Sequence, residues 1–276
     1  MPASGAVTRN TLRQQIADAL RDEVLAGRLQ PGEEFTVKQI AEQYGVSATP
    51  VREALVDLCA QGLLDSDQHK GFRVHRFSVD DYRGMVEARS LVVDGVFQRL
   101  AGRTVPVRGV HRPVVAPRTP ESPTGTDVPA GTSTPAGTST PAGTSAPGVT
   151  WELNVQGVHG APLVSIRRRA EEAARAARAG DLDILIGYDL RFWRELGGFV
   201  ANRYIAEFMH RLRVQAWVFA VPHLRADRRP GDWLWSGHEE LVDAITLADP
   251  DAVIAVIDAY NAHALRWADH VERRQR

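Results

Sequence analysis

The fold is decided by residues 36–58, which read TVKQIAEQYGVSATPVREALVDL. Thr36 and Gln39 form a capping-box pair at the start of a short helix with an apolar stripe, and a glycine ends that helix. Ser47 can cap a further helix, and Pro50 falls within its first turn, where the missing N–H breaks no hydrogen bond of the helix. Two short helices joined by a tight Gly-Val-Ser turn are typical of a helix-turn-helix, whose second helix enters the major groove of DNA.

The residues on either side extend this unit into a winged helix. Upstream, apolar residues recur at every fourth position from Leu12 to Val24 and predict a helix that ends near Gly27. Downstream, two brief apolar segments, 62–64 and 72–74, surround the polar stretch DSDQHKG and predict a β-hairpin. Its tip combines positive charge with a glycine that lets the backbone approach DNA: His69, Lys70 and Gly71.

The N-terminal segment resembles the GntR family of bacterial transcription regulators. The stretch from 27 to 64 carries the likeness, with VS-x-TPVREAL as its strongest mark and HKGFRV following it. The resemblance implies that four side chains contact DNA: Lys38, Ser47, Thr49 and Arg52. It also implies that Gly71 is the wing-tip glycine. Ala48 departs from the family, which often has Arg there, so one base or phosphate contact is expected to be absent.

Charge and composition limit the class of protein. The 276 residues include 33 Lys and Arg and 34 Asp and Glu, so the net charge is close to zero. This balance argues against a strongly basic protein that coats nucleic acid. The single cysteine, Cys59, excludes an internal disulfide framework and fits a buried core position better than a redox sensor. The chain shows neither a signal peptide nor an apolar run long enough to span a bilayer. We therefore expect a cytoplasmic protein that does not enter a membrane.

Composition divides the chain into three parts. Residues 129–146 read PAGTSTPAGTSTPAGTSA, and such small, turn-forming residues bury too little apolar area to fold. We expect residues 103–150 to be a disordered insertion. The winged helix then covers 8–76, and a C-terminal helical domain covers 77–102 together with 151–272.

The fold class expected is mainly α: a winged helix-turn-helix with a small β-hairpin wing, followed by an all-α antiparallel bundle. Ser78 and Asp81 cap a helix that runs to about Gly102. After the insertion, apolar periodicity predicts five more helices: Ile166–Ala179, Asp181–Gly197, Asn202–Val221, Asp232–Ala248 and Pro250–Val271.

Three polar residues lie on the apolar stripes of these helices. Asp189 aligns with Phe192 and Leu196, and His238 and His263 lie in comparable stripes on two later helices. A carboxylate and imidazoles from different helices of one bundle could bind zinc, nickel or manganese. Each histidine could equally be a hydrogen-bonded core residue.

The C-terminal half resembles the FCD ligand-sensing domain that follows the winged helix in the FadR subfamily. DLRFWRELGGFVANRYI, RRPGDWLWSGHEELVDAI and ADPDAVIAVIDAYNAHAL carry the likeness. Many FCD domains bind a divalent metal through one Asp and three His. Three of those positions are matched here: Asp189, His238 and His263. Trp193 occupies the fourth, and an indole cannot donate a lone pair to a metal. Arg89 matches an Arg that often faces the pocket and could clamp a carboxylate, and Arg213 is a second candidate.

Together these features predict a DNA-binding transcription regulator rather than an enzyme. We expect a homodimer that binds a palindromic double-stranded operator, with a small organic acid as effector in the helical domain. Two alternatives remain open. One is a metal-dependent enzyme using Asp189, His238 and His263 to activate water. The other is a regulator whose pocket is filled by Trp193 and binds no ligand.

Overall fold

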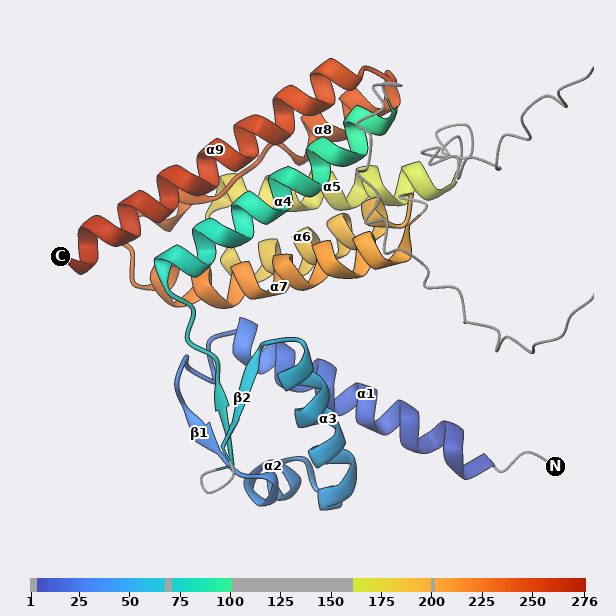
Figure 1. The fold of residues 1–276 in the computed structure, drawn as a ribbon, viewed down its shortest axis with the longest axis vertical. Coiled ribbons are helices and arrows are strands. Elements are labelled where there is room, and N and C mark those ends of the chain that lie inside the picture. The colour runs from blue at the N-terminus through green and yellow to red at the C-terminus, as the bar shows by residue number, and fades with distance from the viewer. Residues whose placement is uncertain (1–3, 68–70, 101–160, 200–201) are drawn as a thin grey trace, which may run out of the picture. The chain divides into compact units, whose positions relative to one another are not determined.

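A computed structural model describes residues 4–67, 71–100, 161–199 and 202–276. The expected insertion, 103–150, the segment 151–160, and His69 and Lys70 of the wing lie outside these ranges. The described part is mainly helical, as the sequence predicts, with one small sheet near the N-terminus (Figure 1). None of its helices is long and apolar enough to cross a membrane.

The N-terminal unit is a winged helix. In chain order it contains α1 (Ser4–Leu25), β1 (Glu34–Phe35), α2 (Val37–Tyr44), α3 (Ala48–Ala60), β2 (Leu64–Asp67) and β3 (Gly71–Val74). The sheet order is β1-β3-β2, with both pairings antiparallel. The predicted hairpin is confirmed, and β1 is an additional strand of two residues. Its Phe35 is buried in the core, which also takes in Leu20, Leu55 and Val74.

The turn between α2 and α3 follows most of the local signals. The capping box is confirmed, because the Thr36 hydroxyl accepts from Gln39 N and the Gln39 side chain accepts from Thr36 N. Gly45 ends α2 in the left-handed conformation, with φ of 63°. Ser47 occupies the N-cap position of α3 but makes no side-chain cap hydrogen bond, so the expectation that its hydroxyl caps the helix is wrong.

Gly71 begins β3 with φ of 98°, and a Cβ there would lie 2.7 Å from the Phe35 carbonyl oxygen. A non-glycine residue at positive φ costs about 1–2 kcal/mol. We expect Gly71→Ala to destabilise the protein by more than this, because the added Cβ also meets the Phe35 carbonyl oxygen. Gly45→Ala is the matched control, because Gly45 also has positive φ but has nothing near the added Cβ. Urea unfolding of the two variants compares them. Equal losses would mean that the contact with Phe35 is relieved without cost.

The C-terminal unit is a bundle of long helices. It contains α4 (Val79–Leu100), α5 (Ala161–Ala179), α6 (Leu182–Gly197), α7 (Arg203–Arg225), the 3-10 turn η2 (Pro230–Trp233), α8 (His238–Thr246) and α9 (Pro250–Gln275). Helix α4 packs along α9, and α5 lies between α6 and α8 (Figure 1). Each helix buries an apolar stripe, as amphipathic periodicity requires.

Several helix boundaries differ from the sequence prediction. Helix α5 starts at Ala161 rather than Ile166, and α9 continues to Gln275 rather than ending at Val271. A single helix over Asp232–Ala248 is wrong: the chain forms η2, then an extended segment, and starts α8 only at His238. The extended segment brings Trp235 to a cavity in the bundle. Helix α7 runs past the predicted end at Val221 and includes Pro222, ending at Arg225.

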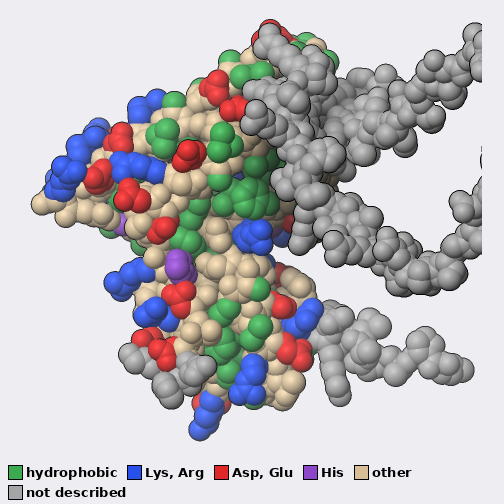
Figure 2. Space-filling view, viewed as in Figure 1, with side chains coloured by type: hydrophobic (Ala, Val, Ile, Leu, Met, Phe, Trp, Pro, Cys, Tyr) green, Lys and Arg blue, Asp and Glu red, His purple; other side chains and the backbone are tan. Residues whose placement is uncertain are grey.

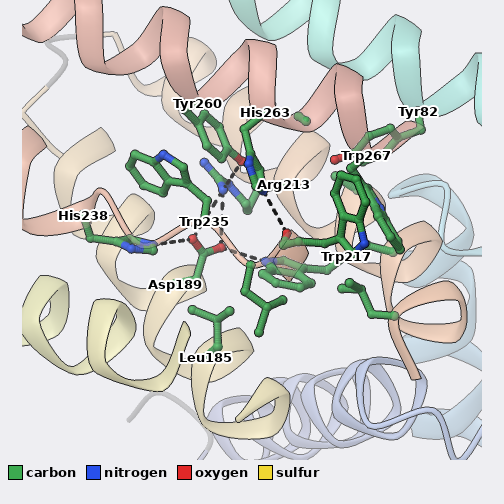
Figure 3. Close-up of a pocket in the computed structure, with 16 residues that line it drawn as sticks. Tyr82, Leu185, Asp189, Arg213, Trp217, Trp235, His238, Tyr260, His263 and Trp267 are labelled. Atoms are coloured by element: carbon green, nitrogen blue, oxygen red, sulfur yellow. Dashed lines mark hydrogen bonds and ion pairs between the residues drawn. The ribbon is translucent and has the colours of Figure 1, made fainter. Parts of the chain in front are cut away.

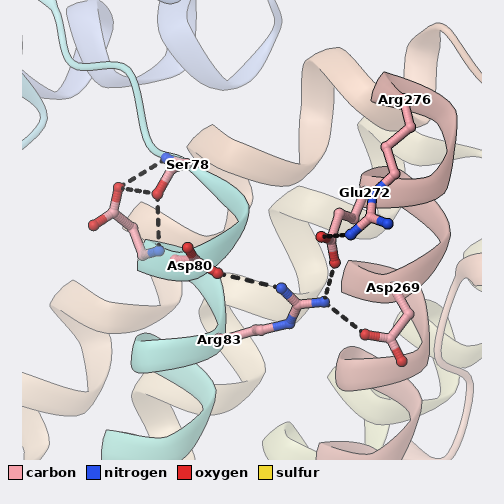
Figure 4. Close-up of polar contacts among 7 residues, drawn as sticks. Ser78, Asp80, Arg83, Asp269, Glu272 and Arg276 are labelled. Carbon is pink, nitrogen blue, oxygen red and sulfur yellow. Dashed lines mark hydrogen bonds and ion pairs between the residues drawn. The ribbon is translucent and has the colours of Figure 1, made fainter.

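Helix α4 starts and docks through polar contacts. The Asp81 carboxylate accepts from Ser78 N at 2.8 Å, and Asp81 N donates to the Ser78 hydroxyl at 3.0 Å, which confirms this capping box (Figure 4). One turn on, the Arg83 guanidinium donates to Asp269 at 2.7 Å and to Glu272 at 2.8 Å. These ion pairs join the start of α4 to the last turns of α9.

Candidate functional site

The N-terminal end of α3 presents a polar face to solvent. Ser47, Thr49 and Arg52 are exposed, and within the described ranges Arg52 makes no ion pair or hydrogen bond. Lys38 on α2 is also exposed, with its ammonium 3.7 Å from a Glu42 carboxylate oxygen. Figure 2 shows acidic and basic side chains intermixed over the visible face, with no continuous basic surface there. On this face, contacts with DNA would therefore depend on individual side chains. These residues have the exposure and freedom that base or phosphate contacts require.

Cys59 packs partly buried against the core of the winged helix. Burial, helped by the nearby Asp65 carboxylate, raises the pKa of its thiol to about 11. Because the thiolate is the reactive form, this thiol is a structural side chain, as the sequence predicts.

The bundle contains a partly open cavity of about 60 Å3 (Figure 3). Its polar lining comes from four helices, with Asp189 on α6, Arg213 on α7, His238 on α8, and Tyr260 and His263 on α9. Aromatic side chains form much of the remaining wall: Tyr82, Trp217, Trp233, Trp235 and Trp267. The pocket is therefore an aromatic box with a few convergent polar groups, which is typical of a small-molecule site.

The Asp189 carboxylate is at the centre of this polar group and is 3% exposed. Trp193 Nε1 donates to its Oδ1 at 3.0 Å, and Trp217 Nε1 donates to its Oδ2 at 2.7 Å. His238 Nε2 lies 3.0 Å from Oδ1, and Arg213 Nη1 lies 3.4 Å from both oxygens. Four N–H groups from three helices thus converge on one buried carboxylate.

These contacts set the ionisation of Asp189. Burial alone raises the pKa of a carboxyl group, but the Arg213 guanidinium and the bonds from His238 and Trp217 outweigh it and lower the pKa of Asp189 to about 2. The side chain is therefore a carboxylate at neutral pH.

Two arginines meet at the Tyr260 hydroxyl. This oxygen accepts from Arg89 Nη1 at 2.7 Å and from Arg213 Nη1 at 2.5 Å. Arg89 also lies over the Tyr260 ring, 4.1 Å from its centroid, and donates Nε to Asn261 Oδ1 at 2.9 Å. Burial lowers the pKa of Arg89, but a guanidinium stays charged at neutral pH.

This cluster has more positive charge and more donors than it can satisfy. Arg213 is paired with Asp189, whereas Arg89 has no carboxylate partner in the described part of the chain. The buried atoms Arg89 Nη2, Asn261 Nδ2 and Trp267 Nε1 also lack hydrogen-bond partners there. Burying unpaired donors and an unbalanced charge is costly, so the cluster is suited to receive an anion.

The structure brings most of the predicted pocket residues together, but His263 and Arg89 do not take part as expected. Trp193, Arg213 and His238 each contact Asp189 as described, although Trp193 is not among the residues that line the cavity. His263 lines the same cavity, but its Nε2 lies 2.9 Å from the Trp233 carbonyl oxygen. In the parts of the chain described, no three His, Cys, Asp or Glu side chains are grouped so as to hold a metal ion. Arg89 stands behind Tyr260 rather than among the lining residues.

Sequence reasoning missed several members of the site, including Tyr260 and the tryptophans of the cavity wall as well as Trp217 and Asn261. Trp217 lies four residues after Arg213 on α7, so both point to the same side of that helix. Asn261 lies four residues after the buried Ile257 and three before the buried Ala264, and is itself 7% exposed. A polar residue within an apolar stripe was the available signal at Asn261, as it was at Asp189.

Comparisons with known proteins match the two halves separately. Residues 12–74 match the model of bacterial regulatory proteins of the gntR family, and residues 156–263 match the FCD domain model. The relative named "Probable D-xylose utilization operon transcriptional repressor" from Paenarthrobacter nicotinovorans is 41% identical over 98 residues, covering 36% of this chain and 43% of the relative. The HTH-type transcriptional regulator McbR of Escherichia coli K12 is 36% identical over 74 residues, covering 27% of this chain and 34% of the relative. These matches thus span less than half of either relative.

Solved structures support the fold over nearly the whole chain. E. coli McbR/YncC aligns with a TM-score of 0.64 at 16% identity, covering 96% of this chain and 99% of that one. The structure titled as a transcriptional regulator GntR from Rhodococcus sp. RHA1 gives 0.59 at 17% identity, covering 93% and 96%. Residues 12–74 are thus similar to the helix-turn-helix of bacterial regulatory proteins of the gntR family, and residues 156–263 are similar to an FCD domain.

Proposed function

We propose that this protein is a cytoplasmic transcription regulator of the FadR type that binds a palindromic operator as a homodimer. The match of residues 12–74 to the gntR family model and the exposed face formed by Ser47, Thr49 and Arg52 support DNA binding. One recognition helix reads only one short half-site, so a dimer on an inverted repeat is the arrangement that gives an operator of useful length. The proposal includes no catalysis.

We further propose that a small organic acid is the effector. The observation that carries this proposal is the excess of buried positive charge: Arg213 pairs with Asp189, whereas the buried Arg89, bonded to Tyr260 and Asn261, has no carboxylate partner among the described residues. A monoanion entering the cavity would balance that charge and could accept a hydrogen bond from the unpartnered Trp267 Nε1.

The size of the cavity limits the effector. A volume of about 60 Å3 is room for roughly four water molecules. An acid of about four to six non-hydrogen atoms fits such a space with small side-chain movements. The volume also argues against the alternative of a pocket filled by Trp193.

Ligand binding would act on DNA through a shift between two states of the dimer. The acid changes operator affinity only if it binds the two states with different affinities. Helices α4 and α9 each contribute residues to the Arg89 cluster, so neutralising its charge would alter how these two helices pack.

A thermal-shift series tests the effector class. Acetate, propionate and pyruvate are compared with acetamide and propionamide, which have similar shape but no charge. We expect at least one acid to raise the midpoint, by roughly 5–10 °C at a hundredfold excess over Kd, and the amides to have no effect. Arg89→Met should abolish the shift, because Asp189 and Arg213 then balance each other. Arg211→Met, at an exposed position on α7, is the control and should retain it.

Equal responses to an acid and its amide would contradict the charge argument. So would an undiminished acid response in Arg89→Met.

A further inference from the structure

The surroundings of Asp189 do not fit a divalent metal ion. A carboxylate has about four lone-pair positions, and here four N–H groups already point at them, from Trp193, Trp217, His238 and Arg213. A metal ligand needs a free lone pair directed at the ion. Each oxygen of Asp189 would have to lose a donor before it could bind a metal, which makes this carboxylate a poor first ligand.

The two histidines are also engaged through their Nε2 atoms. A carbonyl oxygen only accepts, so His263 Nε2 carries the proton and donates to Trp233 O at 2.9 Å. His238 directs Nε2 at Asp189 Oδ1, 3.0 Å away. A nitrogen bearing a proton cannot bind a metal.

A cation is already present beside the carboxylate. The Arg213 guanidinium carbon lies 4.2 Å from the Trp193 ring centroid and 5.0 Å from that of Tyr260, while Nη1 faces both Asp189 oxygens at 3.4 Å. The rings of Trp193 and Tyr260 are themselves stacked, with centroids 5.7 Å apart. Cation–π attraction and the carboxylate thus hold the guanidinium in place. A divalent ion next to Asp189 would be repelled by this charge.

We propose that Arg213 is the permanent cation of this pocket in place of a divalent metal, and that Trp193 positions it. Trp193 has two functions in this arrangement. Its N–H occupies one lone pair of Asp189, and its ring face holds the guanidinium. The indole and the guanidinium therefore exclude a metal together, and replacing one of them is insufficient to admit it. Metal binding can be measured with no effector present, so this proposal and the proposed effector can fail independently.

The experiment measures bound metal and thermal midpoint for the full-length chain. The parent, Trp193→His, Arg213→Met and the double variant Trp193→His with Arg213→Met are each dialysed against zinc, nickel or manganese. After removal of free metal, bound metal is measured by mass spectrometry, and melting curves are recorded with chelator and with metal. Trp193→His combined with Arg211→Met is the matched control, because it removes an exposed Arg from the same helix.

In the parent, in Trp193→His and in the control pair, we expect less than one bound metal per chain. Their thermal midpoints should be the same with chelator and with metal. Arg213→Met should melt roughly 10 °C lower, because it leaves the buried carboxylate unpaired. The double variant frees Asp189 and provides the introduced imidazole and that of His238 as further ligands. It should therefore bind about one zinc per chain, and metal should raise its thermal midpoint. Arg213→Lys keeps the charge and should remain metal-free.

Stoichiometric metal in the parent, lost in folded Asp189→Asn, would overturn the proposal whether or not the Trp193 and Arg213 variants fold. Metal binding by Trp193→His alone, as tight as in the double variant, would show that Arg213 does not exclude the ion. A folded double variant that takes up no metal would show that these two residues are not what excludes it.

Discussion

Asp189→Asn is expected to destabilise the protein by about 3–5 kcal/mol, because it removes one partner of a buried ion pair. The amide retains one acceptor oxygen where the carboxylate had two, yet four N–H groups still point at the position. Its NH2 group would face donors such as Trp217 Nε1, and Arg213 would keep a buried charge with no counter-charge beside it. Chemical denaturation at neutral pH measures the loss as a lower midpoint at unchanged slope.

The control for this prediction is Asp258→Asn. Asp258 is exposed on α9, and such a change normally stays within about 0.5 kcal/mol. A loss below about 1 kcal/mol at Asp189 would contradict the view that its carboxylate organises the pocket, since a loss of that size is close to the roughly 0.5 kcal/mol of an ordinary surface substitution.

Arg52→Ala is expected to remove most of the preference for operator over unrelated DNA. Arg52 is exposed in the first turns of α3 and has no partner in the described part of the protein, so its guanidinium is free to bond a guanine edge. A bidentate contact of this kind is worth about 1–3 kcal/mol, which corresponds to roughly 5- to 150-fold in affinity for each half-site. Fluorescence anisotropy with operator and scrambled duplexes at one salt concentration measures the ratio.

Lys70→Ala provides the contrast to Arg52→Ala. If Lys70 contacts a phosphate, its loss should weaken binding to all sequences by a similar factor. The slope of log K against log salt should then fall in magnitude by about one unit. Arg211→Ala, on an exposed position of the bundle, should change neither quantity. Unchanged operator preference in the Arg52 variant would remove this residue from the set that reads bases.

Local signals were sufficient for most of the fold. The capping boxes at Thr36 and Ser78 and the αL glycine at position 45 depend on residues within four positions of one another, and the structure contains all three. The break between η2 and α8 does not follow from such signals, because placing Trp235 in the cavity wall requires an extended segment where periodicity favours a helix. Strand β1 was missed because two residues are too short for an alternating pattern.

The candidate site was predictable residue by residue but not as an arrangement. Asp189 and His238 were found because a polar residue within an apolar stripe must find a buried partner. Which partner it finds depends on how the helices are rotated against each other, and the stripe of one helix contains no information on that. Arg213 was therefore a secondary candidate, although it is the ion-pair partner of Asp189. His263 was grouped with the other two, although its ring bonds to Trp233.

The central claim is that this chain recognises a specific operator. It is tested most directly by selecting bound fragments from sheared genomic DNA of the source organism, with the parent protein and Arg52→Ala side by side. The account predicts a small set of enriched fragments that share one inverted repeat, and loss of that enrichment in the variant. Fragments with no shared repeat, or the same enriched set with both proteins, would contradict it.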